Sequence, residues 1–430
     1  MKVWSWVASA AALVAVGSVA GFGVAAHEQL AALEHAPAFT LAAPAPVLAP
    51  ATGSPVEGQL LFDALQDAAA NPALAEFHAH VVNAQTGEVV FDRLGGEPLR
   101  PASTTKVLTA AAAMLELGPR DVVTTPVYRG ANPGEVVIKA SGDVWMGREA
   151  IDQLAAQLRE KGVTPVSSVS IDTSLWQGMP ELLPGWNPQD IDGGYVAPLQ
   201  PAMLNGGRGL GEESGDVPRS HTPALDVAQA LADALGAEGV GPGTVPDGAE
   251  QLAAVDSPDL TERLRATMKD SDNVFAEAIG REVALHRGTA DAPGATMAVL
   301  AEHGFDTAAT SINDNSGLSE LNRVTPRLLS SVFAAAAAQE EGPDTAALRP
   351  LLSALPVASA DGTLAERYGD LPGRGWVRAK TGTLDETSGL AGTVTSKNGN
   401  VYAFAFLSNG SNVLEARRAL DELASVLRDF

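Results

Sequence analysis

The chain has 430 residues, enough for two folding domains, and its apolar content of 45% with a mean hydropathy of +0.05 indicates a folded protein. Its formal net charge of -24 disfavours nucleic acid and anionic lipid head groups as partners. Because the chain has no cysteine, thiol catalysis, zinc–cysteine sites and disulfides are excluded.

The N-terminal residues 1–26 predict an export segment. Lys2 is followed by an uncharged, mostly apolar run through Ala26, which fits either a signal peptide or an uncleaved membrane anchor. The length of the run slightly favours the anchor, and a buried core helix is the remaining alternative. Either form of export predicts an extracytoplasmic protein that contacts the membrane only through this segment. Residues 27–58 are rich in Ala and Pro and predict a linker.

The rest of the chain alternates between helix-like and strand-like texture. A helix is predicted over residues 60–72, two strands over 77–93 with a turn at Gln85–Gly87, and an alanine-rich helix after Arg100. Residues 121–255 are rich in Gly, Pro and short β-like runs, so they predict an inserted domain. Helices resume near residue 258, and residues 375–410 alternate as antiparallel strands before a last helix.

These elements predict the α/β (α+β) class. Residues 59–120 and 256–430 are expected to form one domain, with helices and an antiparallel sheet, around the insert at 121–255. The early helices and the last strands must then meet in space.

Ser103 and Lys106 form the single S-x-x-K sequence of the chain, at the start of the alanine-rich helix. Positions three apart on a helix share a face, so the lysine can act as the base for a serine nucleophile. The alternative is an ordinary helix N-terminus, because Ser and Thr are common caps.

Two further motifs favour the catalytic interpretation. Ser271 and Asn273 belong to an SDN sequence between two predicted helices, and Lys380 opens a KTGT sequence that we place at the start of a strand. The order S-x-x-K, S-x-N, K-T-G is typical of penicillin-recognising serine acyl-transferases.

The residue types suit acyl transfer. Lys106 can be neutral, and therefore a base, if burial and the nearby charge of Lys380 lower its pKa. Ser271 can relay a proton to the leaving amine, and Asn273 can bind the substrate amide. Lys380 can hold a substrate carboxylate.

The oxyanion that develops on the substrate carbonyl during acyl transfer also needs hydrogen-bond donors to stabilise it. The backbone N–H of Ser103 at the helix start and that of Thr383 on the strand are the candidates, and each such donor typically contributes about 100- to 1000-fold in rate.

Other kinds of catalytic or metal site have less support in the sequence than the serine–lysine motifs. His78 and His80 share one face of a strand, but no acidic or cysteine cluster accompanies them, so no metal ion and no cofactor are expected. A Ser-His-Asp triad lacks its G-x-S-x-G elbow, and no glycine-rich phosphate loop is present.

From about Gln59 to Phe430 the chain resembles the D-alanyl-D-alanine carboxypeptidase/endopeptidase family of low-molecular-mass penicillin-binding proteins, the group with a large insert between the first two motifs. Besides those motifs, the resemblance rests on residues 314–326, 355–367 and 377–384. It implies a β-lactamase/transpeptidase-like domain, an antiparallel sheet covered by helices. It gives catalytic roles to Ser103, Lys106 and Ser271, and substrate-binding roles to Asn273, Lys380, Thr381 and Thr383.

The resemblance further implies a serine-type D-Ala-D-Ala carboxypeptidase that acts on peptidoglycan stem peptides through a Ser103 acyl-enzyme, with D,D-endopeptidase action in some members. β-Lactams would be covalent inhibitors. Members use an acidic residue of the insert to receive the side-chain amine of a diaminopimelate-type substrate, and Asp190 is our candidate. An ordinary loop aspartate is the alternative for that residue.

The chain departs from the family pattern in places. The 168 positions between Ser103 and Ser271 are fewer than in many members, which suggests a trimmed insert. Asn315 stands where glycine is usual, which puts the local turn in question. Glu320 resembles the deacylating glutamate of class A β-lactamases; we interpret this as coincidence and expect β-lactams to inhibit the enzyme. The alternatives are a β-lactamase or esterase of the same superfamily and a non-catalytic wall-binding protein.

Overall fold

The computed structural model describes residues 6–7, 14, 18, 21–27, 52–54, 56, 58–339 and 342–430. The chain divides into two compact units, 1–50 and 51–430. In the first unit, residues 21–27 are helical. Among the described residues, no helix combines the length and the apolar character needed to cross a membrane. The predicted export segment and linker lie largely outside these residues and stay predictions.

The second unit contains a five-stranded antiparallel sheet in the order β10-β11-β12-β1-β2. Its strands are β1 (Glu76–Asn83), β2 (Val89–Arg93), β10 (Val377–Leu384), β11 (Thr387–Thr395) and β12 (Val401–Asn409). The pairing of β1 with β12, from Glu76 opposite Asn409, joins the first and last strands of the unit. The expectation that early and late segments of this unit meet in space is confirmed.

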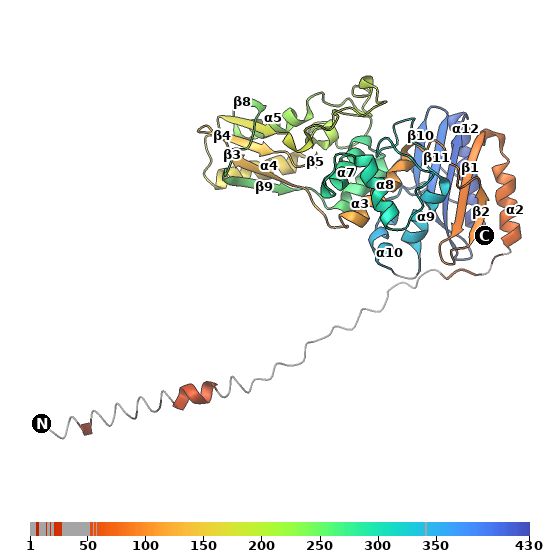
Figure 1. Cartoon of the computed structure of the whole chain (residues 1–430), viewed down its shortest axis with the longest axis horizontal. Helices are drawn as coiled ribbons and strands as arrows, with labels where there is room; N and C mark the ends of the chain where they lie inside the picture. Colours follow the sequence, from red (N-terminus) through yellow and green to blue (C-terminus); the bar gives the residue numbers. More distant parts are fainter. Residues whose placement is uncertain are drawn as a thin grey trace. The chain divides into compact units, whose positions relative to one another are not determined.

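Helices cover both faces of this sheet, and the strands β11 and β12 are therefore buried along nearly their whole length. On one face, α12 packs on β10, β11 and β12, and α2 packs on β2 and on α12, through residues such as Leu65 and Leu420. On the other face, α3 and α9 begin a larger helical layer (Figure 1). The helices of these two layers are α2 (Gly58–Ala69), α3 (Lys106–Glu116), α6 (Leu260–Asp270), α7 (Asn273–His286), α8 (Ala292–Glu302), α9 (Pro326–Ala337), α10 (Pro343–Leu348), α11 (Leu351–Ala354) and α12 (Val413–Asp429).

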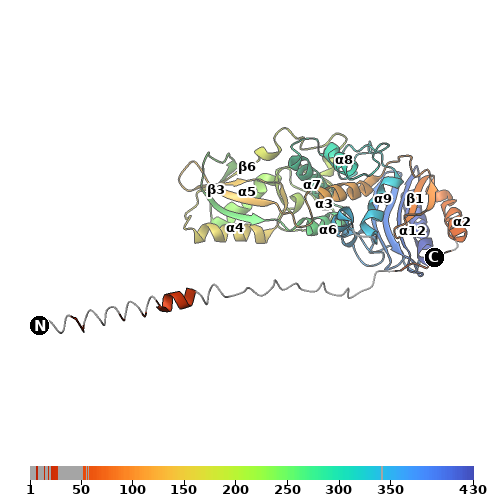
Figure 2. The same ribbon diagram turned by 60° about the horizontal axis from the view of Figure 1, so that its bottom comes forward.

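A second sheet has the order β8-β6-β4-β3-β9, with β4, β6 and β8 parallel and β3 antiparallel to its neighbours. Helices α4 (Arg148–Glu160) and α5 (Pro223–Leu235) pack on one face through alternating apolar residues (Figure 2). The strands are β3 (Thr124–Arg129), β4 (Glu135–Lys139), β6 (Ser168–Asp172), β8 (Gly239–Pro242) and β9 (Gln251–Asp256); β5 (Asp143–Met146) and β7 (Ala202–Leu204) form a separate pair.

Short 3-10 turns complete the unit: η1 (Pro72–Leu74), η2 (Ala102–Thr105), η3 (Ser174–Trp176), η4 (Pro188–Asp190), η5 (Asn205–Gly207) and η6 (Gly362–Leu364). The predicted α/β (α+β) class is confirmed. The division into a catalytic domain and an insert stays a prediction, although the second sheet does have a hydrophobic cluster of its own. One element differs from expectation: KTGT lies inside β10 and not at its start, because the strand begins three residues before Lys380.

Asn315, which stands where the family usually has glycine, is accommodated by another glycine. It is fully buried, accepts a hydrogen bond from Thr296 Oγ1 at 2.7 Å and packs against Gly280 of α7. A Cβ at position 280 would lie 2.3 Å from Asn315 Cγ. The backbone of the loop keeps its glycine at Gly317, where φ is +85°.

We predict that Gly280→Ala lowers the free energy of unfolding by about 1–3 kcal/mol, because the new methyl overpacks against Asn315. Helix propensity alone would favour Ala by about 1 kcal/mol. The check is a double-mutant cycle by chemical denaturation: Asn315→Gly should cost less in the Gly280→Ala background than in the unmodified chain. Additive losses would contradict this account.

Candidate active site

The three sequence motifs meet at one cleft of about 1480 Å³. Ser103 lies in η2, Ser271 and Asn273 flank the break between α6 and α7, and Thr381 and Thr383 lie on β10. Lys106 and Lys380 stand behind this lining, fully buried. All the motif residues singled out in the sequence are therefore brought together.

The Lys106 side chain sits directly behind Ser103. Its Nζ donates to Ser103 Oγ at 3.0 Å, to Asn273 Oδ1 at 2.7 Å and to the carbonyl of Ser316 at 2.7 Å. These three acceptors match the three donors of an ammonium group. The residue is 1% exposed, so its charge has no solvent to stabilise it.

Burial lowers the pKa of Lys106 to about 8, while the carboxylates of Asp314, Asp272 and Glu277 act in the opposite direction. The expected effect of burial is confirmed, but the charge of Lys380 is not among the causes of this shift. A lysine with a pKa near 8 is neutral for part of the time at physiological pH, as a general base must be.

Ser103 does not cap its helix. Neither η2 nor α3 has a side-chain cap, and the neighbouring hydroxyls of Thr104 and Thr105 donate to carbonyls three residues earlier. The ordinary capping interpretation of this stretch is therefore wrong. The hydroxyl of Ser103 is left in the cleft with Lys106 as its partner.

Ser271 and Lys380 form a second serine–lysine pair. Ser271 ends α6 in the left-handed conformation with φ 60°, which turns its side chain toward β10. Lys380 Nζ donates to Ser271 Oγ at 2.8 Å and to the carbonyl of Thr381 at 2.8 Å. Burial lowers the pKa of Lys380 well below its usual value, and the charges of Lys106 and Arg367 add to this effect.

Strand β10 is an edge of its sheet and borders the cleft. Ala379 donates its N–H outward, to the carbonyl of Pro356, so strand alternation turns the N–H of Thr383 toward the same open edge. The side chain of Thr381 bonds Thr363 Oγ1 at 2.8 Å, and that of Thr383 accepts from Arg417 at 2.8 Å.

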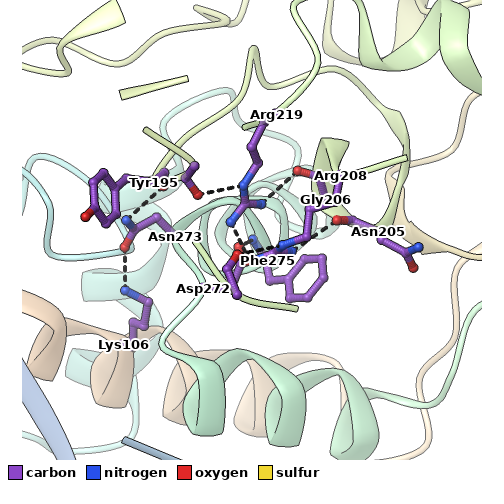
Figure 3. Close-up of polar contacts among 11 residues, drawn as sticks. Lys106, Tyr195, Asn205, Gly206, Arg208, Arg219, Asp272, Asn273 and Phe275 are labelled. Carbon is purple, nitrogen blue, oxygen red and sulfur yellow. Dashed lines mark hydrogen bonds and ion pairs between the residues drawn. The ribbon is translucent and has the colours of Figure 1, made fainter. Parts of the chain in front are cut away.

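The central residue of the SDN motif, Asp272, anchors this loop to the segment between β7 and α5. Its Oδ2 accepts from Arg208 Nη2 at 2.6 Å and from Arg219 Nη2 at 2.8 Å, and all three side chains are buried (Figure 3). Its other oxygen caps α7 through the N–H of Phe275. Burial would raise the pKa of Asp272, but attraction to Arg219 and Arg208 outweighs it, so the pKa lies well below the usual range.

Two buried carboxylates support the loop that carries Ser316. Glu277 accepts the N–H groups of Asn315 and Ser316, and Asp314 accepts those of Gly317 and Ser319. Burial raises the pKa of Glu277 to about 7, and Asp314 adds to the shift. These contacts fix the Ser316 carbonyl that binds Lys106.

Other predicted residues lie at the rim or outside the site. Asp190 lies in η4 and lines the cleft. Glu320 also lines it, with its side chain 65% exposed and 3.7 Å from Arg100. His78 and His80 bond the Glu97 carbonyl and Ser330 Oγ. Within the described residues, no group of three or more His, Cys, Asp or Glu is placed to hold a metal ion.

Sequence reasoning missed Arg208, Arg219 and Arg417. The first two lie in a stretch rich in glycine and without periodicity, and the third resembles the other charged residues of α12. Only the SDN aspartate gave a signal, since a buried carboxylate requires a cationic partner.

We predict that Asp272→Asn lowers the free energy of unfolding by about 3–5 kcal/mol, because two buried guanidinium groups lose their counter-charge. Urea denaturation provides the measurement. The matched control is Glu250→Gln, which breaks the exposed ion pair with Arg129 and should leave stability nearly unchanged. Equal midpoints for the two variants would refute the anchoring role.

The chain is similar to known proteins of one family. The sequence model of the family described as D-Ala-D-Ala carboxypeptidase 3 (S13) matches residues 61–214 and 208–429. A carboxypeptidase of Mycobacterium tuberculosis is 42% identical over 85% of this chain and 82% of its own length. Carboxypeptidase DacB of Mycolicibacterium smegmatis is 40% identical over 98% of this chain and 95% of its own.

A solved structure with the same fold is penicillin binding protein 4 of Haemophilus influenzae. It is 23% identical, with a TM-score of 0.67, over 86% of this chain and 98% of that one. A second structure of that protein is complexed with a β-lactam and has a TM-score of 0.62 over 85% of this chain and 99% of that one. With the extent of the family match and the 40–42% identity, these findings establish that the chain belongs to the D-Ala-D-Ala carboxypeptidase 3 (S13) family and is a serine-type carboxypeptidase.

Proposed function

We propose that the enzyme removes the terminal D-Ala from peptidoglycan stem peptides through an acyl-enzyme on Ser103. The observation that carries this proposal is the 3.0 Å contact between Lys106 Nζ and Ser103 Oγ inside a buried setting that brings the lysine pKa to about 8. The family relatives named as carboxypeptidases support the reaction class.

In the first half-reaction, neutral Lys106 takes the proton of Ser103 as its Oγ attacks the carbonyl carbon of the penultimate residue. The backbone N–H groups of Ser103 and Thr383 are available to the oxyanion that forms. Ser271 then passes a proton to the leaving nitrogen of D-Ala and takes in return the proton that Lys106 removed from Ser103, so Lys106 is neutral again. Lys380 Nζ holds Ser271 Oγ in place at 2.8 Å. Water afterwards attacks the acyl-enzyme, with Lys106 again as the nearest base.

Both ends of the Asn273 side-chain amide are hydrogen-bonded within the protein. Its Oδ1 is occupied by Lys106 and its Nδ2 donates to the carbonyl of Tyr195 at 3.0 Å. We propose that Asn273 orients Lys106, the base. Its Nδ2 can bind the substrate backbone only after the hydrogen bond to the Tyr195 carbonyl has broken. Asp190, at the rim of the cleft, remains our candidate for the amine of a diaminopimelate-type side chain.

β-Lactams are proposed to acylate Ser103 and to leave slowly. The support is that Glu320, the residue that resembles a deacylating glutamate, is an exposed rim residue near Arg100. The related Haemophilus protein has been solved with a β-lactam. We also propose an extracytoplasmic location, because the uncharged run up to Ala26 fits an export segment and the substrate lies outside the cell.

We predict that labelled penicillin attaches covalently to Ser103 and that Ser103→Ala abolishes both this label and the release of D-Ala from a D-Ala-D-Ala peptide. Mass spectrometry of the labelled peptide locates the adduct, and Ser353→Ala, a change of an exposed serine, serves as the control. Rapid turnover of penicillin would favour the β-lactamase alternative. Absence of any acylation would overturn both.

We predict that the acylation rate rises about tenfold per pH unit below about 8 and levels off above it, because only the neutral form of Lys106 accepts the proton. The direction follows from a lowered pKa, since raising the pH through that value increases the neutral fraction. Stopped-flow acylation across this range, with circular dichroism to confirm folding, makes the measurement. A flat profile would exclude Lys106 as the base.

A further inference from the structure

The orientation of the Asn273 amide determines what Lys106 meets. A side-chain amide has an acceptor oxygen on one side and two donor hydrogens on the other. Lys106 Nζ donates to Asn273 Oδ1 at 2.7 Å, so a rotation of the amide by half a turn would bring two donors face to face. The hydrogen bond from Asn273 Nδ2 to the carbonyl of Tyr195, at 3.0 Å, opposes this rotation. The proposed base therefore depends on a carbonyl group outside the three motifs.

The Tyr195 carbonyl lies at the end of a tight turn, residues 190–195. The N–H of Gly194 donates to the carbonyl of Ile191 at 3.1 Å and closes the turn. Gly194 has φ +84°, and a Cβ at this position would lie 2.5 Å from the carbonyl oxygen of Val217. The turn therefore packs so closely against its neighbour that only glycine fits at this point.

The Arg219 side chain holds this turn to the SDN loop (Figure 3). Its backbone N–H donates to the carbonyl of Ile191 at 3.0 Å, and its Nε donates to the carbonyl of Gly194 at 2.9 Å. Its Nη2 donates to Asp272 Oδ2 and its Nη1 to the carbonyl of Gly206, both at 2.8 Å. Each side-chain nitrogen of this buried arginine therefore has a partner, and one residue connects the turn with the SDN loop.

Arg208 provides a comparison within the same site. It binds the same oxygen of Asp272, at 2.6 Å, and its side chain is as deeply buried as that of Arg219. Its Nη1 and Nε donate instead to the carbonyls of Asn205 and Gly215, at 3.1 and 3.0 Å. The two arginines thus share the compensation of the Asp272 charge, and Arg219 is the one of the two that reaches the turn.

We propose that Arg219 is a positioning residue for the acylation of Ser103. It holds the turn in place, and the Tyr195 carbonyl then keeps the oxygen of the Asn273 amide directed at Lys106. The turn is thereby a part of the acylation machinery and not only a wall of the cleft. This inference rests on the proposed role of Lys106 as the base.

The test compares Arg219→Lys with Arg208→Lys in the full chain, by stopped-flow acylation with labelled penicillin across the pH range. Each substitution keeps a positive charge beside Asp272, but a single ammonium group cannot reproduce the several bonds of a planar guanidinium. In Arg219→Lys the turn loosens and Lys106 loses Asn273 Oδ1 as a fixed acceptor, which disfavours its charged form.

The midpoint of the rate profile should therefore move down by about one pH unit in Arg219→Lys, as expected for the loss of a hydrogen bond to a charged group. The rate above the midpoint should fall about tenfold, because the base is no longer held in place. In Arg208→Lys the midpoint should stay where it is in the unmodified enzyme.

The charged groups around Lys106 stay the same in this comparison. They are the carboxylates of Asp272, Glu277 and Asp314, which act on the pKa of Lys106, and the ammonium group of Lys380, whose own pKa is lowered by Lys106. Neither variant removes one of these groups or changes the net charge of the chain. A moved midpoint therefore reports the hydrogen bonds of Lys106.

An unmoved midpoint in Arg219→Lys would overturn the proposal even if this variant is less stable. A purely structural role would reduce the amount of active enzyme and leave the midpoint where it was. An equal shift in Arg208→Lys would also overturn it, because the compensation of the Asp272 charge, and not the turn, would then be responsible.

A second pair of variants decides if thermal melting shows that Arg219→Lys does not fold. Gly194→Ala displaces the turn and leaves both arginines unchanged, so it should also lower the midpoint. The control is Gly236→Ala, where φ is +72° and the space around a new Cβ is open; it should leave the midpoint unmoved. Equal midpoints for this pair would overturn the proposal.

The behaviour of the unmodified enzyme separates this inference from the proposed function. If that enzyme is not acylated, or is acylated with a flat pH profile, the role of Lys106 as the base fails and the inference falls with it. A normal profile without a shift in the variants contradicts the inference alone.

Discussion

The buried ammonium group of Lys106 is the constraint on which the active site depends. A charged nitrogen removed from water must have its three donors satisfied, and the acceptors come from three places in the chain: Ser103, Asn273 and the Ser316 carbonyl. A shift of any one segment leaves a buried donor unpaired. The nucleophile, the SDN loop and the Ser316 loop are therefore held in register by one atom.

The protonation of that nitrogen reflects a balance between desolvation and buried acids. Burial alone would drive the lysine toward the neutral form, and the carboxylates of Asp314, Asp272 and Glu277 restrain the shift. Each of these carboxylates is itself fixed by backbone N–H groups or by arginine. The polar network thus both positions the base and keeps its pKa near the working pH, which a simple apolar pocket would not do.

Many of the secondary-structure elements and the catalytic motifs could be predicted from the sequence, but several residues that support the active site could not. Periodic helices and alternating strands were recognisable because their hydrophobic pattern is local. The catalytic motifs were recognisable because their residue types and their order along the chain are typical of penicillin-recognising serine acyl-transferases. Arg208 and Arg219 were not, because their partner lies more than fifty positions away and the stretch around them has no period. The pKa of Lys106 was expected to fall through burial and through the charge of Lys380. Burial is the cause in the structure, and which of the two effects dominates depends on the assembled molecule, which the motifs alone do not show.

The pairing of β1 with β12 has a consequence for how the protein is made. The strand that follows the first helix of the unit cannot complete its edge until the strand ending at Asn409 has been synthesised, since Glu76 pairs with that residue. During translation the apolar side chains of β1 therefore stay exposed until almost the entire chain has been synthesised, and they can associate with other molecules in that time. In a polypeptide with this topology the sheet cannot form until the last segments are present. Until then the chain can stay extended, and an extended chain can pass through a narrow channel.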